Sequence, residues 1–263
     1  MERKMDLMSL FDLSGKKAIV TGGSGRYGRQ MVEALASAGA TVYTASRNLE
    51  TNEALAGTLR KRGLAVYAGM VDQGDEESIK TFLTKITEDG KKVDILVNNS
   101  VYRPMRGFDD DAERFDDSMR VNATGIFMIS RAFGDHMAAN GGGSIINIGS
   151  YMGILGPDDT LYKDTGMTGF VPDYFFHKGG MNNFTRFLAA YYGPKNVRCN
   201  ILNLGGLFNH QDERFVKRYN ERTFLKRMAN ETDIMGAVVF LASDASAYIT
   251  GSALSVDGGY SAK

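Results

Sequence analysis

Tyr174 and Lys178 are residues whose types and spacing could perform proton transfer. They stand four positions apart in a segment expected to be helical, so both side chains share one helix face. A tyrosine hydroxyl titrates near pH 10 in model peptides, and acid/base work near neutrality requires a shift of about 3 units, roughly 4 kcal/mol. A cation about 4 Å away supplies an energy of that size at an effective dielectric of about 20. The pair is suited to acid/base catalysis, although this spacing alone often arises by chance.

A glycine-rich segment, TGGSGRYG at residues 21–28, lies between an apolar run, AIV, and an expected helix. Glycines let the backbone approach a pyrophosphate, and a helix N-terminus offers unpaired N–H groups to the anion. The segment fits the spellings TGxxGxxG and GxGxxG, whereas TGxxxGxG would need a glycine in place of Arg26. A simple tight turn is the structural alternative. The candidate cofactor-binding residues of this segment are Gly22, Ser24, Gly25, Arg26, Tyr27 and Gly28.

The residues after the next β-branched run, ATVYTA, indicate which nicotinamide dinucleotide is bound. A carboxylate at this place suits the ribose 2′-hydroxyl of NAD(H), and a cation suits the 2′-phosphate of NADP(H). The sequence has Ser46 and Arg47 there, and an arginine can bind a phosphate with two hydrogen bonds. Arg26 can add a second cation. We expect NADP(H), with NAD(H) the less favoured cofactor; a solvated surface position for Arg47 is the alternative.

Alternating β-branched and amphipathic segments must position these residues. Strands are expected at 16–20, 40–45, 64–71, 93–99, 144–149, 197–202 and 253–256. Helices are expected at 29–38, 50–62, 76–88, 111–137, 173–192 and 231–242. The pattern predicts a single-domain, doubly wound Rossmann fold of the α/β class, with a seven-stranded parallel sheet and helices on both faces. Ligands then bind over the carboxyl ends of the strands.

Composition and charge exclude several classes of protein. The 31 basic residues balance 31 acidic ones, so no net field favours nucleic acid or an anionic membrane. No apolar run is long enough for a signal peptide or a membrane span, so we expect a cytoplasmic protein with neither partner. The single cysteine, Cys199, lies in an apolar strand pattern and is expected to be buried. No metal is expected.

The chain resembles the short-chain dehydrogenase/reductase family from Lys16 to Tyr260, because eight segments match in family order. They are TGGSGRYG, Asp72 after the third strand, VNNS, RVNATGIF, SIINIGS, YFFHK, NILNLGG and SVDGG. One such segment would be weak evidence, whereas eight in order are specific.

The resemblance assigns roles to four catalytic candidates. It implies that Tyr174 is the general acid/base, that Ser150 holds the substrate oxygen, and that Lys178 binds the nicotinamide ribose and favours the tyrosinate. It further implies that Asn122 holds a water of a proton relay. The structural alternatives are that Ser150 caps a turn and that Asn122 is a buried polar residue satisfied by backbone.

The resemblance also completes the expected cofactor site and assembly. It implies that Asp72 approaches the adenine, that Asn99 lies along the cofactor, and that Gly205 contributes after the sixth strand. By family analogy the protein is a homotetramer, with the helices at 111–137 and 173–192 at one interface.

Three departures from the family pattern concern the glycine turn, the loop over the nicotinamide and the segment before Tyr174. The glycine spelling is typical of sugar-nucleotide epimerases and dehydratases, but these have a further C-terminal domain, for which the roughly twenty residues after Ser243 leave no room. Leu204 stands where the family usually has proline. Tyr174 follows Ser150 by 24 positions, a longer spacing than usual, which defines an insertion at 151–172.

The insertion beside Tyr174 is expected to form a wall of the substrate pocket. It is similar to an insertion in family members of bacterial sugar and surface-glycan metabolism. We expect residues 1–263 to form a single dinucleotide-binding and catalytic domain. Besides the insertion, this domain has an N-terminal extension at 1–14 and a substrate loop at 206–227. Basic residues nearby could bind a carboxylate or phosphate; a solvated helix is the alternative. The candidate substrate-binding residues are Ser150, Arg103, Tyr162 and His210.

These observations predict an NADP(H)-dependent oxidoreductase that interconverts a carbonyl and a secondary alcohol, on a sugar or sugar acid, and works as a reductase in the cell. Two alternatives stay open. One is an enzyme of the sugar-nucleotide dehydratase or epimerase type. The other is a regulator that binds NADP(H) without catalysis, which would have no use for a proton relay.

Overall fold

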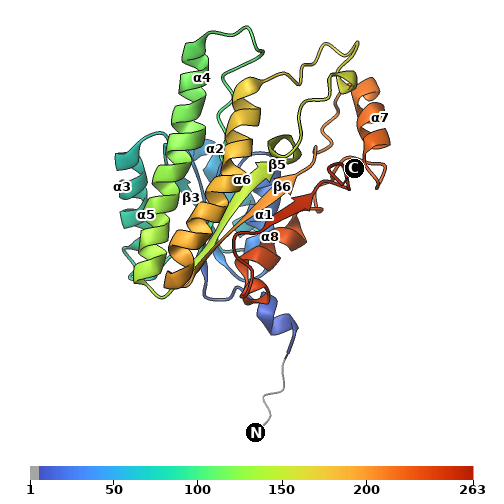
Figure 1. Cartoon of the computed structure of the whole chain (residues 1–263). Coiled ribbons are helices and arrows are strands. Elements are labelled where there is room, and N and C mark those ends of the chain that lie inside the picture. The colour runs from blue at the N-terminus through green and yellow to red at the C-terminus, as the bar shows by residue number, and fades with distance from the viewer. Residues whose placement is uncertain (1–5, 263) are drawn as a thin grey trace.

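Seven strands form one fully parallel sheet in the order β3-β2-β1-β4-β5-β6-β7, and Figure 1 shows β6 beside β5. This computed structural model describes residues 6–262, so residues 1–5 of the expected N-terminal extension lie outside the described part. The strands are β1 Lys17–Thr21, β2 Thr41–Ser46, β3 Val66–Met70, β4 Ile95–Asn98, β5 Gly143–Ser150, β6 Val197–Leu204 and β7 Ala253–Val256. Because β1 pairs with both β2 and β4, the strand order reverses there.

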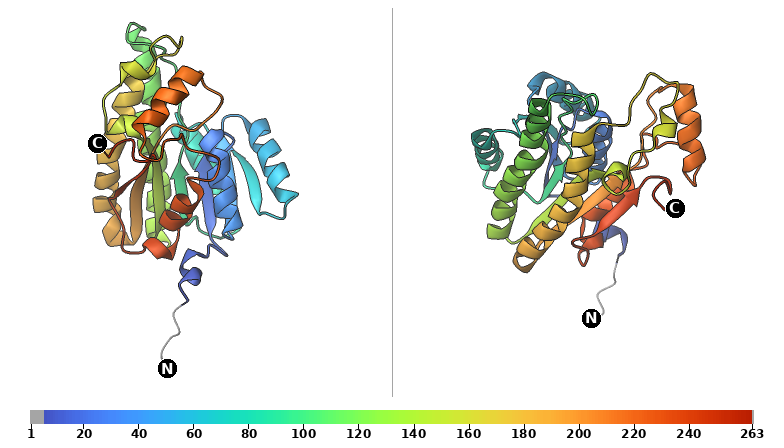
Figure 2. Two further views of the ribbon diagram at one scale, coloured as in Figure 1. Left: turned by 90° about the vertical axis from the view of Figure 1, so that its right-hand side faces the viewer. Right: turned by 45° about the horizontal axis from the view of Figure 1, so that its top comes forward.

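Helices cover both faces of the sheet (Figures 1 and 2). One face holds α1 Arg26–Ser37, α2 Leu49–Arg60 and α8 Met235–Ala242, and the other holds α3 Glu76–Thr87, α5 Gly125–Ala139 and α6 Pro172–Tyr192. Successive strand residues point to opposite faces. Ala18 and Val20 therefore join the core under α1 and α8, while Ile19 joins the core under α5 and α6.

Two further helices and several short turns lie at the ends of the sheet. They are α4 Ala112–Met119, α7 Glu213–Arg222, the π-helical η2 Arg120–Thr124, and the 3₁₀ turns η1 Met8–Phe11, η3 Tyr151–Gly153, η4 Asp159–Leu161, η5 Gly193–Lys195 and η6 Asp244–Ser246. Figure 1 shows α7 beside the chain that follows β5, at the end to which the strands point.

The doubly wound Rossmann fold is confirmed, with two corrections to its helices. The expected helix 111–137 is α4, a π turn and α5 in succession. The expected helix 231–242 begins only at Met235, because Asn230 and Asp233 use their side chains to close a turn before it.

Cys199 lies in β6 and is fully buried, as expected, and burial raises the pKa of its thiol to about 12. Within residues 6–262 no helix is long and apolar enough to cross a membrane, and no cluster of His, Cys, Asp and Glu could hold a metal.

Candidate active site

A cavity of about 850 Å³ lies over the carboxyl ends of the strands, where the strand order reverses. The segments that line it follow the carboxyl ends of strands β1 to β6, and further lining residues come from the insertion, the loop before α7 and α7 itself. The expected site residues that line this cavity are Gly22, Ser24, Gly25, Arg26, Tyr27, Gly28, Ser46, Arg47, Asp72, Asn99, Arg103, Ser150, Tyr162, Tyr174, Lys178 and Gly205.

The glycine turn is shaped by close backbone contacts. Gly22 has a positive φ of 62°, and a Cβ on Gly28 would lie 2.3 Å from the carbonyl oxygen of Gly22. The side-chain amide of Asn99 donates to the carbonyls of Thr21 (2.9 Å) and Gly22 (3.0 Å). Asn99 therefore ties the turn to the end of β4 and leaves the N-terminus of α1, at Arg26, open to the cavity.

The cation expected at the adenosine end is available for a phosphate. The guanidinium of Arg47 lies 5.5 Å from the ring centroid of Tyr102, and both Arg47 and Arg26 are exposed. Neither arginine has a carboxylate partner among the described residues. Asp72 accepts a hydrogen bond from the N–H of Gly74 (2.9 Å). The glycine turn leaves no room for side chains at its glycines, and the two arginines, without carboxylate partners among residues 6–262, stand beside it. These features fit a dinucleotide that carries a 2′-phosphate.

The candidate reaction centre lies on the first turns of α6. Lys178 donates from its Nζ to the carbonyl of Ile148 at 2.5 Å, and its side chain is buried. Burial, and then the charge of Arg103, lower the pKa of Lys178 to about 7. The centroid of the Tyr174 ring lies 4.4 Å from the Arg103 guanidinium and 5.8 Å from the Lys178 Nζ. Two basic side chains therefore contact the residue expected to act as the general acid/base.

Ser150 ends β5 and is 5% exposed. Its Oγ accepts a hydrogen bond from the N–H of Met152 at 3.2 Å, which starts the short η3 turn. An accepting hydroxyl still has its proton to donate. The residue can therefore cap this turn and still donate to a substrate oxygen in the cavity, so the two interpretations of Ser150 are compatible.

Asn122 lies in the π turn between α4 and α5 and does not line the cavity. Its Nδ2 donates to the carbonyl of Tyr102 (2.6 Å) and to the Ser118 Oγ (2.9 Å), and its Oδ1 accepts from the N–H of Tyr102 (2.9 Å). The side chain thus ties the loop after β4 to α4, with both amide hydrogens donated. A π turn takes main-chain carbonyls out of the regular ladder, so a relay water would be held by the main chain here.

His177, which sequence reasoning overlooked, packs edge-on against Tyr174 with ring centroids 5.2 Å apart. It is 4% exposed, and burial, followed by the charges of Lys178 and Arg103, lowers its pKa to about 3. The imidazole is therefore neutral at working pH and adds no third positive charge beside Tyr174.

The substrate end of the cavity is aromatic. Tyr151, Tyr162, Phe215 and Tyr219 pack together there, with ring centroids 5.3 to 6.0 Å apart along the cluster. They come from the insertion and from α7, and no local motif in the sequence brings these segments together. Of the four, only Tyr162 was expected in the site.

The arginines of α7 hold the insertion in place. Arg222 pairs with Asp158 and donates to Thr160, and Arg218 donates to the carbonyl of Lys163. Arg214, also on α7, pairs with Asp212 at the start of its own helix. These arginines make structural contacts. Neither the substrate-binding interpretation nor the solvated-helix alternative described this role.

His210 is not brought to the cavity. It lies in a separate open depression of about 760 Å³ with Phe208, Asp212 and Lys217. The backbone at His210 has a positive φ of 54°, and its ring contacts Phe208 edge-on at 5.2 Å. His210 therefore lines a different depression from Tyr174, and the structure does not bring it to the expected substrate site.

Together, the fold and the cavity define an oxidoreductase of the dinucleotide-binding class. A family profile described as "Enoyl-(Acyl carrier protein) reductase" matches residues 27–261. The chain belongs to the short-chain dehydrogenase/reductase family.

Similar proteins act on different alcohols. The chain is 33% identical to the 7alpha-hydroxysteroid dehydrogenase of Clostridium sardiniense (94% of each chain) and 32% identical to the galactitol 2-dehydrogenase (L-tagatose-forming) of Cereibacter sphaeroides (97% of this chain, 99% of that one). A gluconate 5-dehydrogenase from Burkholderia cenocepacia, solved in complex with NADP and tartrate, superposes with a TM-score of 0.89 at 28% identity, covering 98% of this chain and 100% of that one.

Proposed function

We propose that this protein is an NADP(H)-dependent oxidoreductase that interconverts a carbonyl and a secondary alcohol on a sugar or sugar acid, and that it works as a reductase in the cytoplasm. The observation that carries the proposal is the placement of Arg103. Its guanidinium lies on the Tyr174 ring, whereas the guanidinium of Arg47 lies on the Tyr102 ring, and both arginines line the cavity. An anionic substrate beside the acid/base residue and a 2′-phosphate beside Arg47 would thus each meet a separate cation.

The cofactor site comprises the glycine turn, the N-terminus of α1 and the adenosine end. Arg47, with Arg26, would bind the 2′-phosphate, with Ser46, Asp72 and Asn99 alongside. When bound, the nicotinamide supplies or accepts a hydride. Gly205 borders the same cavity after β6.

The proposed chemistry at the substrate carbon uses four residues. Tyr174 gives or takes the proton of the substrate oxygen, and Ser150 donates its hydroxyl proton to the same oxygen. Lys178 holds positive charge behind Tyr174 and binds the nicotinamide ribose. Asn122 completes a proton path through its main chain and fixes the loop that carries Arg103 through its side chain.

The substrate proposal draws on the similar proteins and on the cavity. Galactitol and gluconate are the substrates named for two of them, which supports a polyol or sugar acid. Tyr162 and the neighbouring aromatic rings offer flat apolar surfaces to the C–H face of a sugar, while Arg103 offers a cation to a carboxylate.

A homotetramer is also part of the proposal. Phe127 on α5 and Phe187 and Tyr191 on α6 are 43%, 59% and 53% exposed, and the last two stack on each other at 6.2 Å. Exposed apolar groups on two adjacent helices suit an interface between copies. Sedimentation of the purified protein would test this, and a monomer at micromolar concentration would contradict it.

The test of function is cofactor absorbance over time, with NADPH and NADH in parallel. The panel contains keto-sugars, keto-sugar acids, simple ketones and a ketosteroid, and Tyr174→Phe protein is the blank. We expect turnover of a sugar or sugar acid with NADPH and a roughly 1000-fold lower rate in the blank, because the proton donor is lost.

Other outcomes would identify the alternatives. Conversion of a sugar nucleotide without net cofactor turnover would favour the dehydratase or epimerase type. Tight NADPH binding without turnover, unchanged by Tyr174→Phe, would favour a regulator. Turnover of the ketosteroid alone would overturn the substrate class and keep the reaction type.

A further inference from the structure

The Gly205–Gly206 turn, which directly follows β6, is held at all four of its backbone polar groups. The N–H of Gly205 donates to the carbonyl of Val256 (2.9 Å), and the carbonyl of Gly206 accepts from the N–H of Ala229 (2.9 Å). The other two groups bind tyrosine hydroxyls. Both glycines line the cavity, so this turn is part of the wall that a bound cofactor and substrate would share.

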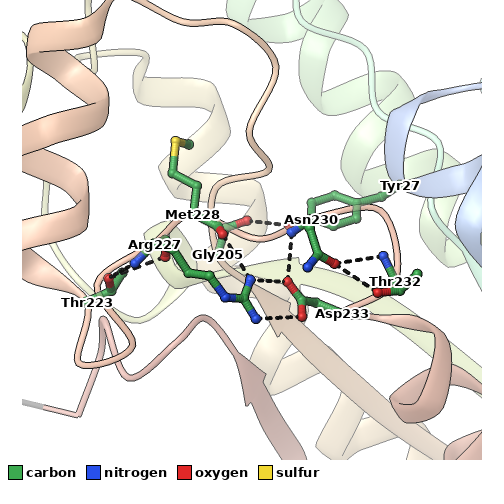
Figure 3. A network of polar contacts seen from close by, with 8 residues as sticks. All are labelled: Tyr27, Gly205, Thr223, Arg227, Met228, Asn230, Thr232 and Asp233. Carbon is green, nitrogen blue, oxygen red and sulfur yellow. Dashed lines mark hydrogen bonds and ion pairs between the residues drawn. The ribbon is translucent and has the colours of Figure 1, made fainter.

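The two tyrosines reach the turn from different helices, α1 and α7. Tyr27, in the first turn of α1, donates its hydroxyl to the carbonyl of Gly205 at 2.9 Å (Figure 3). Tyr219, on α7, accepts at its hydroxyl from the N–H of Gly206 at 2.6 Å. One hydroxyl thus comes from the helix that follows the glycine turn, and the other from the helix that borders the aromatic end. Together the two contacts form a clamp on the Gly205–Gly206 turn.

Two consecutive glycines have the largest conformational freedom of any dipeptide, so a single conformation of this turn depends on such contacts. Burial raises the pKa of Tyr27, and the nearby Tyr219, Asp233 and Tyr174 raise it further. The Tyr27 hydroxyl therefore stays protonated and able to donate. Tyr27, Tyr219 and both glycines line the same cavity as Tyr174, so the clamp belongs to the wall of the proposed active site.

The substrate side of the clamp is a connected unit. Arg227 pairs with Asp233 and donates to the carbonyl of Met228, and the N–H of Asn230 donates to Asp233 at 2.7 Å, so the loop that carries Ala229 is closed on itself (Figure 3). The ion pair between Arg222 on α7 and Asp158 in the insertion joins the insertion to the same unit. The Gly205–Gly206 turn links this unit to α1.

We propose that Tyr27 and Tyr219 are a pair of positioning residues that hold the Gly205–Gly206 turn in one conformation and thereby set the relative placement of cofactor and substrate. The catalytic part of this proposal rests on the proposed function. Neither hydroxyl touches the reacting atoms in this scheme. Losing one should therefore lower kcat more than it weakens binding, because misplacement of reacting groups by about 1 Å can cost about 100-fold in rate.

The clamp itself is tested without cofactor or substrate, by amide hydrogen exchange in the Leu204–Phe208 segment. Tyr27→Phe removes a bond to Gly205, yet we expect exchange at the N–H of Gly206, which binds Tyr219, to become about tenfold faster. Tyr260→Phe is the matched control, because Tyr260 packs on Tyr219 at 5.0 Å and its hydroxyl is not part of the clamp. Unchanged exchange at Gly206 in Tyr27→Phe would show that the two contacts are independent and would overturn the proposal.

The catalytic role is tested by a double-variant cycle with NADPH and a substrate found in the panel. Tyr27→Phe and Tyr219→Phe should each lower kcat about tenfold and change either KM less than about threefold. The double variant should lose little more than either single one, because one loss already frees the turn. Additive losses, or losses confined to KM, would contradict positioning through a shared turn.

The two proposals can fail separately. If wild-type protein turns over nothing in the panel, the proposed function fails and the catalytic role with it, while the exchange experiment still decides the clamp. If the wild type is active and exchange responds but kcat does not, the clamp exists and its catalytic role is overturned.

Discussion

The cofactor end and the substrate end of the cavity are built in different ways. At the cofactor end, the glycine turn, Arg47 and Asn99 each follow directly after a strand, so the parallel sheet places them together. At the substrate end, the insertion and α7 are held by side-chain contacts between residues 55 and 64 positions apart, such as Arg222 with Asp158. The first end depends on the backbone of the whole sheet, and the second on an aromatic cluster and a few partly exposed side-chain pairs between two loops.

The difference indicates where change is tolerated. A cofactor site assembled from strand ends cannot vary without altering the sheet, whereas loops joined by side-chain pairs can change shape while the sheet stays intact. Substitutions at the cofactor and catalytic positions should therefore act strongly and specifically. Substitutions between the insertion and α7 should act weakly, and on substrate affinity alone.

Lys178→Met should give the largest effect and separate activity from stability. Activity should fall at least 100-fold, because the cation behind Tyr174 is lost. Burial and Arg103 lower the pKa of Lys178 from 10.5 to about 7, a burden of roughly 5 kcal/mol on the folded state at neutral pH. Met removes it but leaves the Ile148 carbonyl without its donor, so we expect a net gain of about 2 kcal/mol in the free energy of unfolding.

The pH dependence of unfolding checks this interpretation. The folded-state pKa of Lys178 lies below the unfolded one, so the unfolded chain binds more protons between pH 7 and 10.5. The stability of the wild type should therefore rise through that window, and urea unfolding at pH 7 and pH 9 should show a smaller rise in Lys178→Met. Tyr174→Phe is the control, since it removes activity and keeps the buried amine. Equal pH slopes in all three proteins would contradict the assignment.

Arg47→Asp comes next and tests the cofactor end alone. The guanidinium has no carboxylate partner among the described residues, so the change should break no internal contact except that with the Tyr102 ring. NADPH affinity should fall about 30-fold, through loss of a charged hydrogen-bond donor and gain of repulsion, and NADH affinity should change little. Fluorescence titration with both dinucleotides measures this. Equal losses for the two would assign Arg47 to structure.

The sequence predicted the cofactor end of the cavity better than the substrate end. The sheet and the residues after its strands were predicted, because periodicity and glycine spacing are local properties. The aromatic cluster of Tyr151, Phe215 and Tyr219 was not, because its members meet only through the fold. His210 lines a different depression from the one expected, because its place depends on how the loop before α7 folds and no local pattern marks this. The Tyr27–Gly205 contact spans 178 positions and likewise has no local signal.

Arg103→Met tests the boundary between the two ends. The guanidinium lies 4.4 Å from the centroid of the Tyr174 ring, so its loss should reduce kcat/KM for a sugar acid about tenfold more than for a neutral sugar. Arg106→Met is the matched control, because Arg106 also lines the cavity but does not stack on Tyr174. A uniform loss across both substrates would make Arg103 a support for Tyr174 and would leave the anion preference unsupported.

Asp158→Asn should give the smallest effect, confined to the substrate end. Its partner Arg222 and Asp158 itself have side chains 30% and 31% exposed, so the pair contributes at most about 1 kcal/mol. Substrate KM should rise about threefold as the insertion loosens from α7, while NADPH affinity and kcat stay within error. Asp159→Asn, at the exposed neighbouring position, should change none of these. If Asp158→Asn weakened NADPH as much as substrate, the two ends would share one support, and the contrast between a sheet-built and a pair-built end would not hold.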